Sequence, residues 1–153
     1  MKTIDLSKAE VRDLNQALHD QAKTLEDREW VVTHPGGKHN LAVGVNEALS
    51  IDIQGHGSIG HMSCFMGQAG RLVVCGDAGD ALGDSLYETR IYVKGTVKSL
   101  GSDCIEKEMR AEHLEELAEL LNRAGFAEDP ASFKRYGSAR QLYNFKVDNA
   151  SAY

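Results

Sequence analysis

Two short segments of the chain repeat one pattern at a spacing of nineteen residues. Each of them, Arg71–Gly76 (RLVVCG) and Arg90–Gly95 (RIYVKG), joins a β-prone run to a glycine. The same spacing reaches back from Gly76 to Gly57. A period of about 20 residues with one short strand in each unit is typical of a solenoid, whose repeats stack edge to edge. A Rossmann sheet would need a longer repeat that contains a helix, so the chain is predicted to be mainly β, a short parallel β-helix.

Glycine marks the expected corners of this solenoid. A corner often needs a positive φ angle, or leaves no room for a side chain beneath the next repeat. When the glycines of successive repeats are aligned, apolar residues coincide at two further positions, which predicts side chains stacked inward. These sets are Ile59, Ala78 and Val97, and Met62, Ala81 and Leu100. The predicted structural corner glycines are Gly57, Gly60, Gly76, Gly79, Gly83, Gly95 and Gly101.

Helices are predicted on both sides of the solenoid. The run Ser7–Glu10 matches a capping box, and an apolar stripe follows it, so residues 8 to about 23 are expected to form an amphipathic helix. A second helical stripe begins at Met109 and ends before Gly125, which is placed as a C′ glycine. The second helix is a plausible cap for the open end of the stack.

The remaining segments complete the predicted organisation. Alternating apolar residues over 41–45 and 49–53 predict strands that lead into the repeat. Asp129 and Pro130 have the chemistry of a helix start and predict a short helix to Arg135. The predicted parts of the chain are an N-terminal helical arm (1–30), the parallel β-helix with its glycine repeats (31–108), and a C-terminal capping helix with a partner-binding tail (109–153).

Composition argues against several classes of protein. The formal net charge is -6 and no concentrated basic face is visible, which disfavours a nucleic-acid surface. No apolar run approaches the ~20 residues that span a membrane, and the N-terminus lacks the apolar core of a secretory signal. We therefore expect a cytoplasmic protein, in which Cys64, Cys75 and Cys104 are reduced and mostly buried.

A fingerprint of dinucleotide-binding proteins, G-x-G-x-x-G, lies at Gly55–Gly60 after a predicted strand. Asp77 stands about 20 residues further on, where that fingerprint has an acidic residue. The intervening segment 61–70 is short and contains glycine, without a convincing helix to present its N-terminus to a pyrophosphate. Because the glycines also recur at the solenoid period, the pattern favours structural corners over a nucleotide site.

The sequence contains two groups of possible metal ligands: His56, His61 and Cys64, and Asp77, Asp80 and Asp84. No second cluster of Cys and His completes a tetrahedral set for the first group. The second group lacks the pattern of a calcium loop. A nucleophile elbow, a phosphate loop and a cysteine quartet are also missing. We therefore predict no catalytic, cofactor-binding or metal-binding residue in this chain, which has the character of a scaffold.

Two arginines could face a partner. Arg71 and Arg90 are nineteen residues apart and should lie side by side on adjacent repeats. They form either a solvated ladder flanked by Glu88 or a contact for an acidic partner surface. The aromatic residues of the tail predict a segment that lies on a surface of this chain or of a neighbour. The possible partner-facing residues are Arg71, Arg90, Tyr136, Arg140 and Tyr143.

The longest glycine-rich run resembles a known family. It extends from Gly57 through Gly76-Asp77-Ala78-Gly79-Asp80 to Met109, and the segments 31–44 and 136–140 are also similar. On these motifs the chain resembles the GXGXG-motif family of glutamate-synthase-like complexes, and within it the small subunit of N-methylglutamate synthase (methylamine-glutamate N-methyltransferase). The chain departs from the family in being shortened, because family members usually have several more glycine-rich coils between Gly55-His56 and Gly57.

This resemblance implies a right-handed parallel β-helix and a non-catalytic scaffold subunit. The chemistry of such complexes belongs to other subunits, one amidotransferase-like and one carrying FMN and an iron-sulfur cluster. The resemblance thus implies a hetero-oligomer with both of them and no cofactor in this chain. Two alternatives stay open: the glycine-solenoid subunit of formylmethanofuran dehydrogenase, and a free-standing solenoid that binds a ligand, a nucleotide or a metal.

Overall fold

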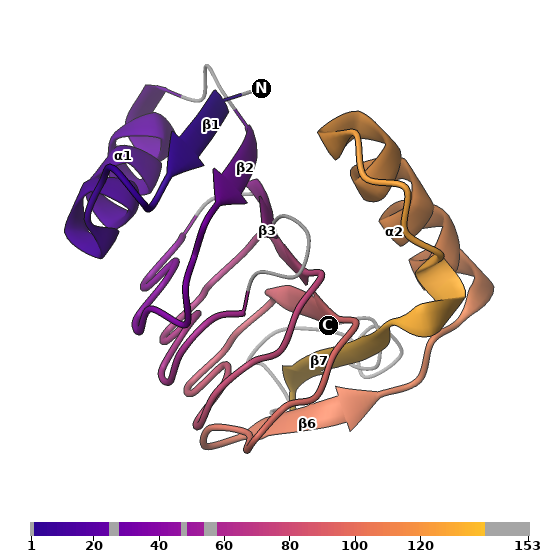
Figure 1. The fold of residues 1–153 in the computed structure, drawn as a ribbon. Coiled ribbons are helices and arrows are strands. Elements are labelled where there is room, and N and C mark those ends of the chain that lie inside the picture. The colour runs from indigo at the N-terminus through magenta and orange to yellow at the C-terminus, as the bar shows by residue number, and fades with distance from the viewer. Residues whose placement is uncertain (1, 25–27, 47–48, 54–57, 140–153) are drawn as a thin grey trace.

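The computed structural model describes residues 2–24, 28–46, 49–53 and 58–139, and within them the chain forms one seven-stranded, mostly parallel sheet with two α-helices (Figure 1). The strand order is β1-β2-β3-β4-β5-β7-β6. The elements are β1 (Lys2–Asp5), α1 (Val11–Thr24), β2 (Glu29–Thr33), β3 (Ser50–Ile53), β4 (Arg71–Val74), β5 (Arg90–Val93), β6 (Cys104–Lys107), α2 (Ala111–Ala124), the 3-10 helix η1 (Pro130–Ser132) and β7 (Lys134–Ser138).

The first five strands run parallel, and each pairs with the next one along the chain. Ile51 of β3 pairs with Leu72 of β4, which pairs with Ile91 of β5. The offset is 21 residues in the first of these pairings and 19 in the second, so the nineteen-residue spacing correctly predicts the register of β4 and β5. No helix separates β3, β4 and β5 in the residues that the structure describes.

The segments between these strands also contact one another. Ile59, Ala78 and Val97 form successive parallel bridges, which confirms the predicted coincidence of these three residues. Ile59 N donates to Asp77 O at 2.9 Å, and Gly79 N donates back to Ile59 O at 3.0 Å. Neighbouring segments are therefore joined by backbone hydrogen bonds along their connections as well as along their strands.

The second predicted coincidence is correct for Met62 and Ala81 and wrong by one residue for Leu100. Leu100 pairs with Leu82, which is 1% exposed, and not with the half-buried Ala81. The offset shortens from 19 residues at Val97 to 18 at Leu100, because Leu82 lies four positions after Ala78 whereas Leu100 lies only three positions after Val97.

Left-handed backbone recurs in the connecting segments, but mostly at residues other than glycine. Alternate residues have positive φ, and they match from one segment to the next: Asn40, Ala42 and Gly44; Met62, Cys64 and Met66; Ala81, Gly83 and Ser85. These conformations replace the strand that was predicted over 41–45, where the structure has turns. Among the predicted corner glycines that the structure describes, only Gly83 has a positive φ, of 68°.

At other predicted corners, glycine is required because the backbone of a neighbouring segment lies too close for a side chain. A Cβ atom on Gly101 would lie 2.4 Å from Asp84 Cα, and one on Gly60 would lie 2.4 Å from Gly37 O. Real Cβ atoms essentially never come so near to backbone atoms, so no side chain fits between the stacked segments at these positions. Gly57 lies outside the described residues.

Two hydrophobic clusters pack on opposite faces of the sheet. The larger cluster contains the inward row of Ile51, Leu72 and Ile91, and α1 adds Leu14 and Leu18 to it. The smaller cluster joins Val73 and Tyr92 of the sheet to apolar residues of α2, namely Leu117, Leu120 and Leu121. Figure 1 shows α1 beside β1 and α2 on the other side of the sheet. Neither helix is long and apolar enough to cross a membrane, within the residues described.

The predicted helices occur with adjusted boundaries. α1 begins at Val11, because Asp13 Oδ2 accepts a hydrogen bond from Glu10 N, whereas the Ser7 hydroxyl donates to Asp5 and makes no capping box. α2 ends as predicted, with Gly125 at a φ of 77°. Of the helix predicted from Asp129 to Arg135, only η1 forms.

The C-terminal part of the sheet was not predicted. β7 pairs antiparallel with β5 on one side and with β6 on the other, so β6 is not the next parallel strand after β5. Lys134–Ser138 thereby covers the edge of β5 along Ile91–Val93. An edge strand exposes unpaired backbone groups, and β7 satisfies those of β5.

Replacing Gly101 by alanine tests the stacking of the connecting segments. We expect Gly101→Ala to lower the free energy of unfolding by about 3 kcal/mol, because the methyl group meets the backbone of Asp84 and not a movable side chain. Gly125→Ala is the matched control. It has open space around its Cβ position and a positive φ, so alanine there should cost only the left-handed backbone conformation, about 1 kcal/mol. Urea unfolding measures both, and equal losses would contradict the stacking.

Candidate functional site

Several charged residues of this chain lie on the sheet face that α2 covers. Residues in register point to the same side of a parallel sheet, so the pairings place Glu29, Ser50, Arg71 and Arg90 in one row of this face. The adjacent row contains Val31, Asp52, Val73, Tyr92, Arg135 and Lys107. Val73 and Tyr92 contact α2, which identifies both rows as the face beneath that helix.

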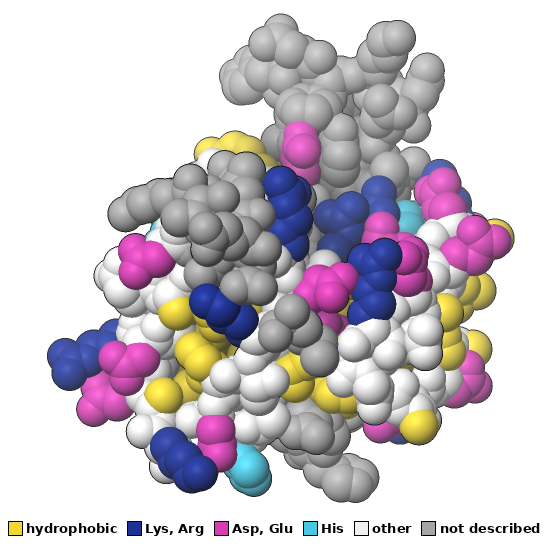
Figure 2. All heavy atoms as spheres, turned by 90° about the horizontal axis from the view of Figure 1, so that it is seen from above, with side chains coloured by type: hydrophobic (Ala, Val, Ile, Leu, Met, Phe, Trp, Pro, Cys, Tyr) yellow, Lys and Arg dark blue, Asp and Glu magenta, His cyan; other side chains and the backbone are white. Residues whose placement is uncertain are grey.

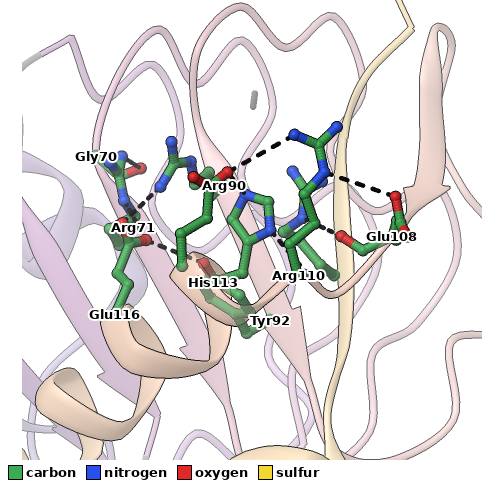
Figure 3. Close-up of polar contacts among 10 residues, drawn as sticks. Gly70, Arg71, Arg90, Tyr92, Glu108, Arg110, His113 and Glu116 are labelled. Atoms are coloured by element: carbon green, nitrogen blue, oxygen red, sulfur yellow. Dashed lines mark hydrogen bonds and ion pairs between the residues drawn. The ribbon is translucent and has the colours of Figure 1, made fainter. Parts of the chain in front are cut away.

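Glu116 of α2 is the centre of this site. Its Oε1 accepts from Arg71 Nε at 2.6 Å and from the Tyr92 hydroxyl at 3.0 Å, and its Oε2 accepts from a terminal nitrogen of Arg90 at 2.5 Å (Figure 3). The three charged side chains are only 17–28% exposed. Charge-assisted hydrogen bonds to one carboxylate are strong under such partial burial, so Glu116 fixes α2 to two neighbouring strands at once.

A second group of cations lies toward the start of α2. Arg135 is 1% exposed, and its Nε donates to the Glu108 carbonyl at 3.0 Å. Burial lowers the pKa of Arg135, and the neighbouring Arg90 and Arg110 lower it further. Burial and then Arg135 lower the pKa of Lys107 to about 8. Positive charges are thus held close together on the part of the face formed by β5, β7 and β6.

His113 is the buried histidine of this group. Its Nδ1 accepts a hydrogen bond from Arg110 N at 3.2 Å, so a neutral ring carries its proton on Nε2. That Nε2 is 3.5 Å from a carboxylate oxygen of Glu112, but this contact does not meet hydrogen-bond geometry, and the nitrogen has no hydrogen-bond partner within the described ranges. Burial and then Arg135 lower the pKa of His113. The ring is therefore neutral at neutral pH and acts as a helix cap.

A small cavity of about 230 Å³ opens beside the Glu116 centre. It lies between the C-terminal half of α2 and the starts of β3 and β4, and its lining residues are Leu49, Ser50, Gly70, Arg71, Glu116, Glu119, Leu120 and Arg123. Arg123 pairs with Glu29 and with Glu119. The charged groups of the cavity are thus paired with one another. Basic and acidic side chains also lie next to one another on the face in Figure 2.

The glycine fingerprint does not form a nucleotide site in the part that the structure describes. Gly55, His56 and Gly57 lie outside the described residues. Residues 61–66 are turns, so no helix N-terminus follows Gly60. The Asp77 carboxylate, which would be the acid of the fingerprint, accepts from Thr96 N at 2.8 Å in the next segment.

The structure separates the first group of possible metal ligands. His61 is exposed and stacks on His39 with ring centroids 3.7 Å apart, whereas Cys64 is 2% exposed within the core. His56 lies outside the described residues. No group of three or more His, Cys, Asp or Glu side chains in the described ranges is placed to hold a metal ion.

The three aspartates of the second group bridge neighbouring segments. Asp80 accepts from the Ser99 hydroxyl at 3.1 Å, and Asp84 accepts from Ser102 N at 3.0 Å, in the same manner as Asp77. Each aspartate thus binds a residue 18 or 19 positions further on. Their carboxylates hold one segment to the next, which gives them a structural role.

Three of the predicted partner-facing residues make contacts within this chain. Arg71 and Arg90 lie side by side as predicted, and both bind Glu116 of the same chain. Tyr136 is 6% exposed and belongs to the larger hydrophobic cluster, so its side chain offers no surface to a partner, which corrects that prediction. Arg140 and Tyr143 lie outside the described residues.

Sequence reasoning missed Glu116, Tyr92, Asp52, Arg135 and His113. Glu116 directly precedes Leu117 of the apolar stripe. Its position at the border of that stripe could have indicated that its side chain lies close to the sheet. Tyr92 stands two residues after Arg90, so period-2 alternation places both on one face. Arg135 carried no signal, because the strand that contains it was not predicted.

Among curated proteins, the chain is 39% identical to Protein GlxC of Rhizobium meliloti (strain 1021) over 228 aligned residues, which cover the whole of both chains. The chain therefore belongs to the family of Protein GlxC. Because the chain has 153 residues against 228 aligned ones, at least 75 aligned positions have no counterpart in it. No family model matches the chain, and no solved structure does.

Neutralising the carboxylate of Glu116 tests the centre of this site. We expect Glu116→Gln to lower the free energy of unfolding by about 2 kcal/mol, because Arg71 and Arg90 lose the charge that compensates them in a partly buried place. Glu119→Gln, on the same helix but 60% exposed, should change it by less than about 0.5 kcal/mol. Urea unfolding of both variants measures the difference, and similar losses would refute the central role of Glu116.

The reactivity of Cys64 tests its assignment to the core. Burial raises the pKa of the Cys64 thiol to about 12, so the reactive thiolate is scarce at neutral pH. We expect a disulfide reagent at pH 8 to modify this thiol on the order of 100-fold more slowly in the folded chain than in urea. Rapid labelling of folded protein at Cys64, located by peptide mass mapping, would show instead an accessible thiol.

Proposed function

We propose that this chain is a non-catalytic scaffold subunit of a glutamate-synthase-like complex, and specifically of N-methylglutamate synthase. The proposal rests on the resemblance to the GXGXG-motif family and is consistent with membership in the family of Protein GlxC. In the proposed reaction, glutamate and methylamine give N-methylglutamate and ammonia. This chain would hold the catalytic subunits in register while ammonia or methylamine passes between them.

One observation supports a scaffold role most directly. The motif residues on which the resemblance depends are engaged in contacts between neighbouring segments. Asp77, Asp80 and Asp84 each bind the following segment, and Gly101 allows the backbone of Asp84 to approach. Because these polar groups bind neighbouring segments, few of them are left to act in catalysis. This is what we expect of a scaffold subunit.

The proposal includes the architecture. We propose that the parallel strands and their bridged connections are the coils of a short right-handed parallel β-helix. The register of β3, β4 and β5 and the bridges of Ile59, Ala78 and Val97 support this assignment. Each coil contacts only its neighbours in such a fold, so whole coils can be lost without disturbing the others. The aligned positions without counterpart in this chain would correspond to lost coils.

The proposed partners are an amidotransferase-like subunit and a subunit with FMN and an iron-sulfur cluster. Both cofactors would belong to the partners. The complex is proposed to be cytoplasmic. Arg140 and Tyr143 remain proposed partner-facing residues, together with the edges of Arg71 and Arg90 that Glu116 leaves exposed.

Purification from the native organism tests the proposal. An affinity-tagged copy of the full chain is expected to co-purify with the two proposed subunits, identified by mass spectrometry, and with FMN and iron in proportion to them. The purified complex should form N-methylglutamate from glutamate and methylamine, and the isolated chain should form none. Complex reassembled without this chain should lose most of its activity.

Two results would contradict the proposal. One is turnover of glutamate and methylamine by the isolated chain. The other is full activity of the catalytic subunits after this chain has been removed. A complex that uses ammonia but not methylamine would retain the scaffold role and refute the assignment to N-methylglutamate synthase.

A further inference from the structure

An aspartate without a hydrogen-bond partner at one oxygen lies beneath α2. Asp52 of β3 is 3% exposed, and the register places it between Val31 of β2 and Val73 of β4. Its Oδ1 is buried and has no hydrogen-bond partner among the described residues. Val31 and Val73 are also buried, and Val73 packs on α2. A carboxyl group thus occupies an otherwise apolar place under the helix.

Charged side chains lie on three elements next to this part of β3, and no cation among the described residues hydrogen-bonds the Oδ1 of Asp52. They are Glu29 of β2, Arg71 of β4, and Glu116, Glu119 and Arg123 of α2. Arg71 donates to Glu116 and to the Gly70 carbonyl. Arg123 binds Glu29 and Glu119. Both cations are therefore engaged by other acceptors, and Glu29 adds a like charge near Asp52.

We propose that the protonation of Asp52 controls how firmly the C-terminal half of α2 lies on the sheet. With a neutral Asp52, the helix covers no charge between Val31 and Val73. When the carboxyl ionises, a charge stands in a dry place without compensation, and burying such a charge is strongly unfavourable. The C-terminal half then loosens and admits water to the carboxylate, whereas Glu116 keeps the preceding turn on β4 and β5.

The energetics place this change near neutral pH. Burial, and then the charge of Glu29, raise the pKa of Asp52 to about 7 from its ordinary 3.8. An acid with a raised pKa destabilises the folded state as it ionises. Below pH 3.8 the folded and unfolded chains both carry the proton, so the group has no effect. As pH rises above 3.8, Asp52 ionises in the unfolded chain first, and the free energy of unfolding falls. The fall is complete above about pH 7, where Asp52 ionises in the folded chain as well.

Hydrogen exchange of the full chain, read by NMR, tests the proposal. Amides over residues 117–124 should lose at least about tenfold in protection between pH 5.5 and pH 8.5, after correction for intrinsic exchange, which corresponds to about 1.4 kcal/mol. Amides of β4 and β5 in the same sample should keep theirs, which distinguishes loosening of α2 from global unfolding. The carboxyl carbon of Asp52 should titrate over the same range.

Three variants distinguish the effect of Asp52 ionisation on α2 from other effects of pH. Asp52→Asn should keep residues 117–124 equally protected at both pH values, because it cannot ionise. Glu29→Gln should move the transition to lower pH, because it removes the like charge. Asp20→Asn, an exposed aspartate on α1, should behave as the unchanged chain does.

The proposal would be overturned by any of three results. These are pH-independent protection of residues 117–124 in the unchanged chain, the same pH dependence in Asp52→Asn, and ionisation of Asp52 near pH 4. If Asp52→Asn fails to fold, the carboxyl titration and the Glu29→Gln midpoint still decide the question.

Discussion

Backbone hydrogen bonds between neighbouring segments are the interaction on which the rest of this structure depends. They join not only the strands but also the connections between them, as where Ala78 N donates to Thr96 O at 2.9 Å and Lys98 N donates back to Ala78 O at 3.0 Å. Each bond adds roughly 1 kcal/mol net, and the bonds require the segments to lie in register. Side chains that would separate the segments are excluded, which explains glycine at positions such as 60 and 101.

Stacking of this kind leaves the sheet with two faces of different chemistry. One face carries the aliphatic row of Ile51, Leu72 and Ile91 into the main core. The other is mixed, because a small apolar cluster under α2 is bordered by charged side chains. Glu116 stabilises this mixed face because its carboxylate accepts hydrogen bonds from Arg71, Arg90 and Tyr92. The same face contains Asp52, whose Oδ1 accepts no hydrogen bond from an arginine in the part of the chain that the structure describes.

The sequence predicted those features that follow from spacing. Nineteen residues between Arg71 and Arg90 gave the register of β4 and β5, and the apolar stripe before Gly125 gave the end of α2. Features that depend on tertiary context were not predictable. Left-handed conformations at Met62 and Ala81 are imposed by stacking on residues that do not prefer them. The strand β7 is short and has little apolar alternation, so its pairing with β5 could not be predicted from the sequence and is seen only in the structure. The candidate site was missed largely for the same reason, because α2 brings Glu116 to arginines that precede it by 45 and 26 residues.

Through-space NMR contacts test the register of the stacked segments most directly. In uniformly labelled protein, contacts between backbone protons should join Leu72 to Ile91 in the strands, and both Ile59 to Ala78 and Ala78 to Val97 in the connections. Contacts at these positions, 19 residues apart throughout, are the result that the account predicts. Contacts that pair β4 with β5 in another register, or connecting segments that show none with their neighbours, would contradict it.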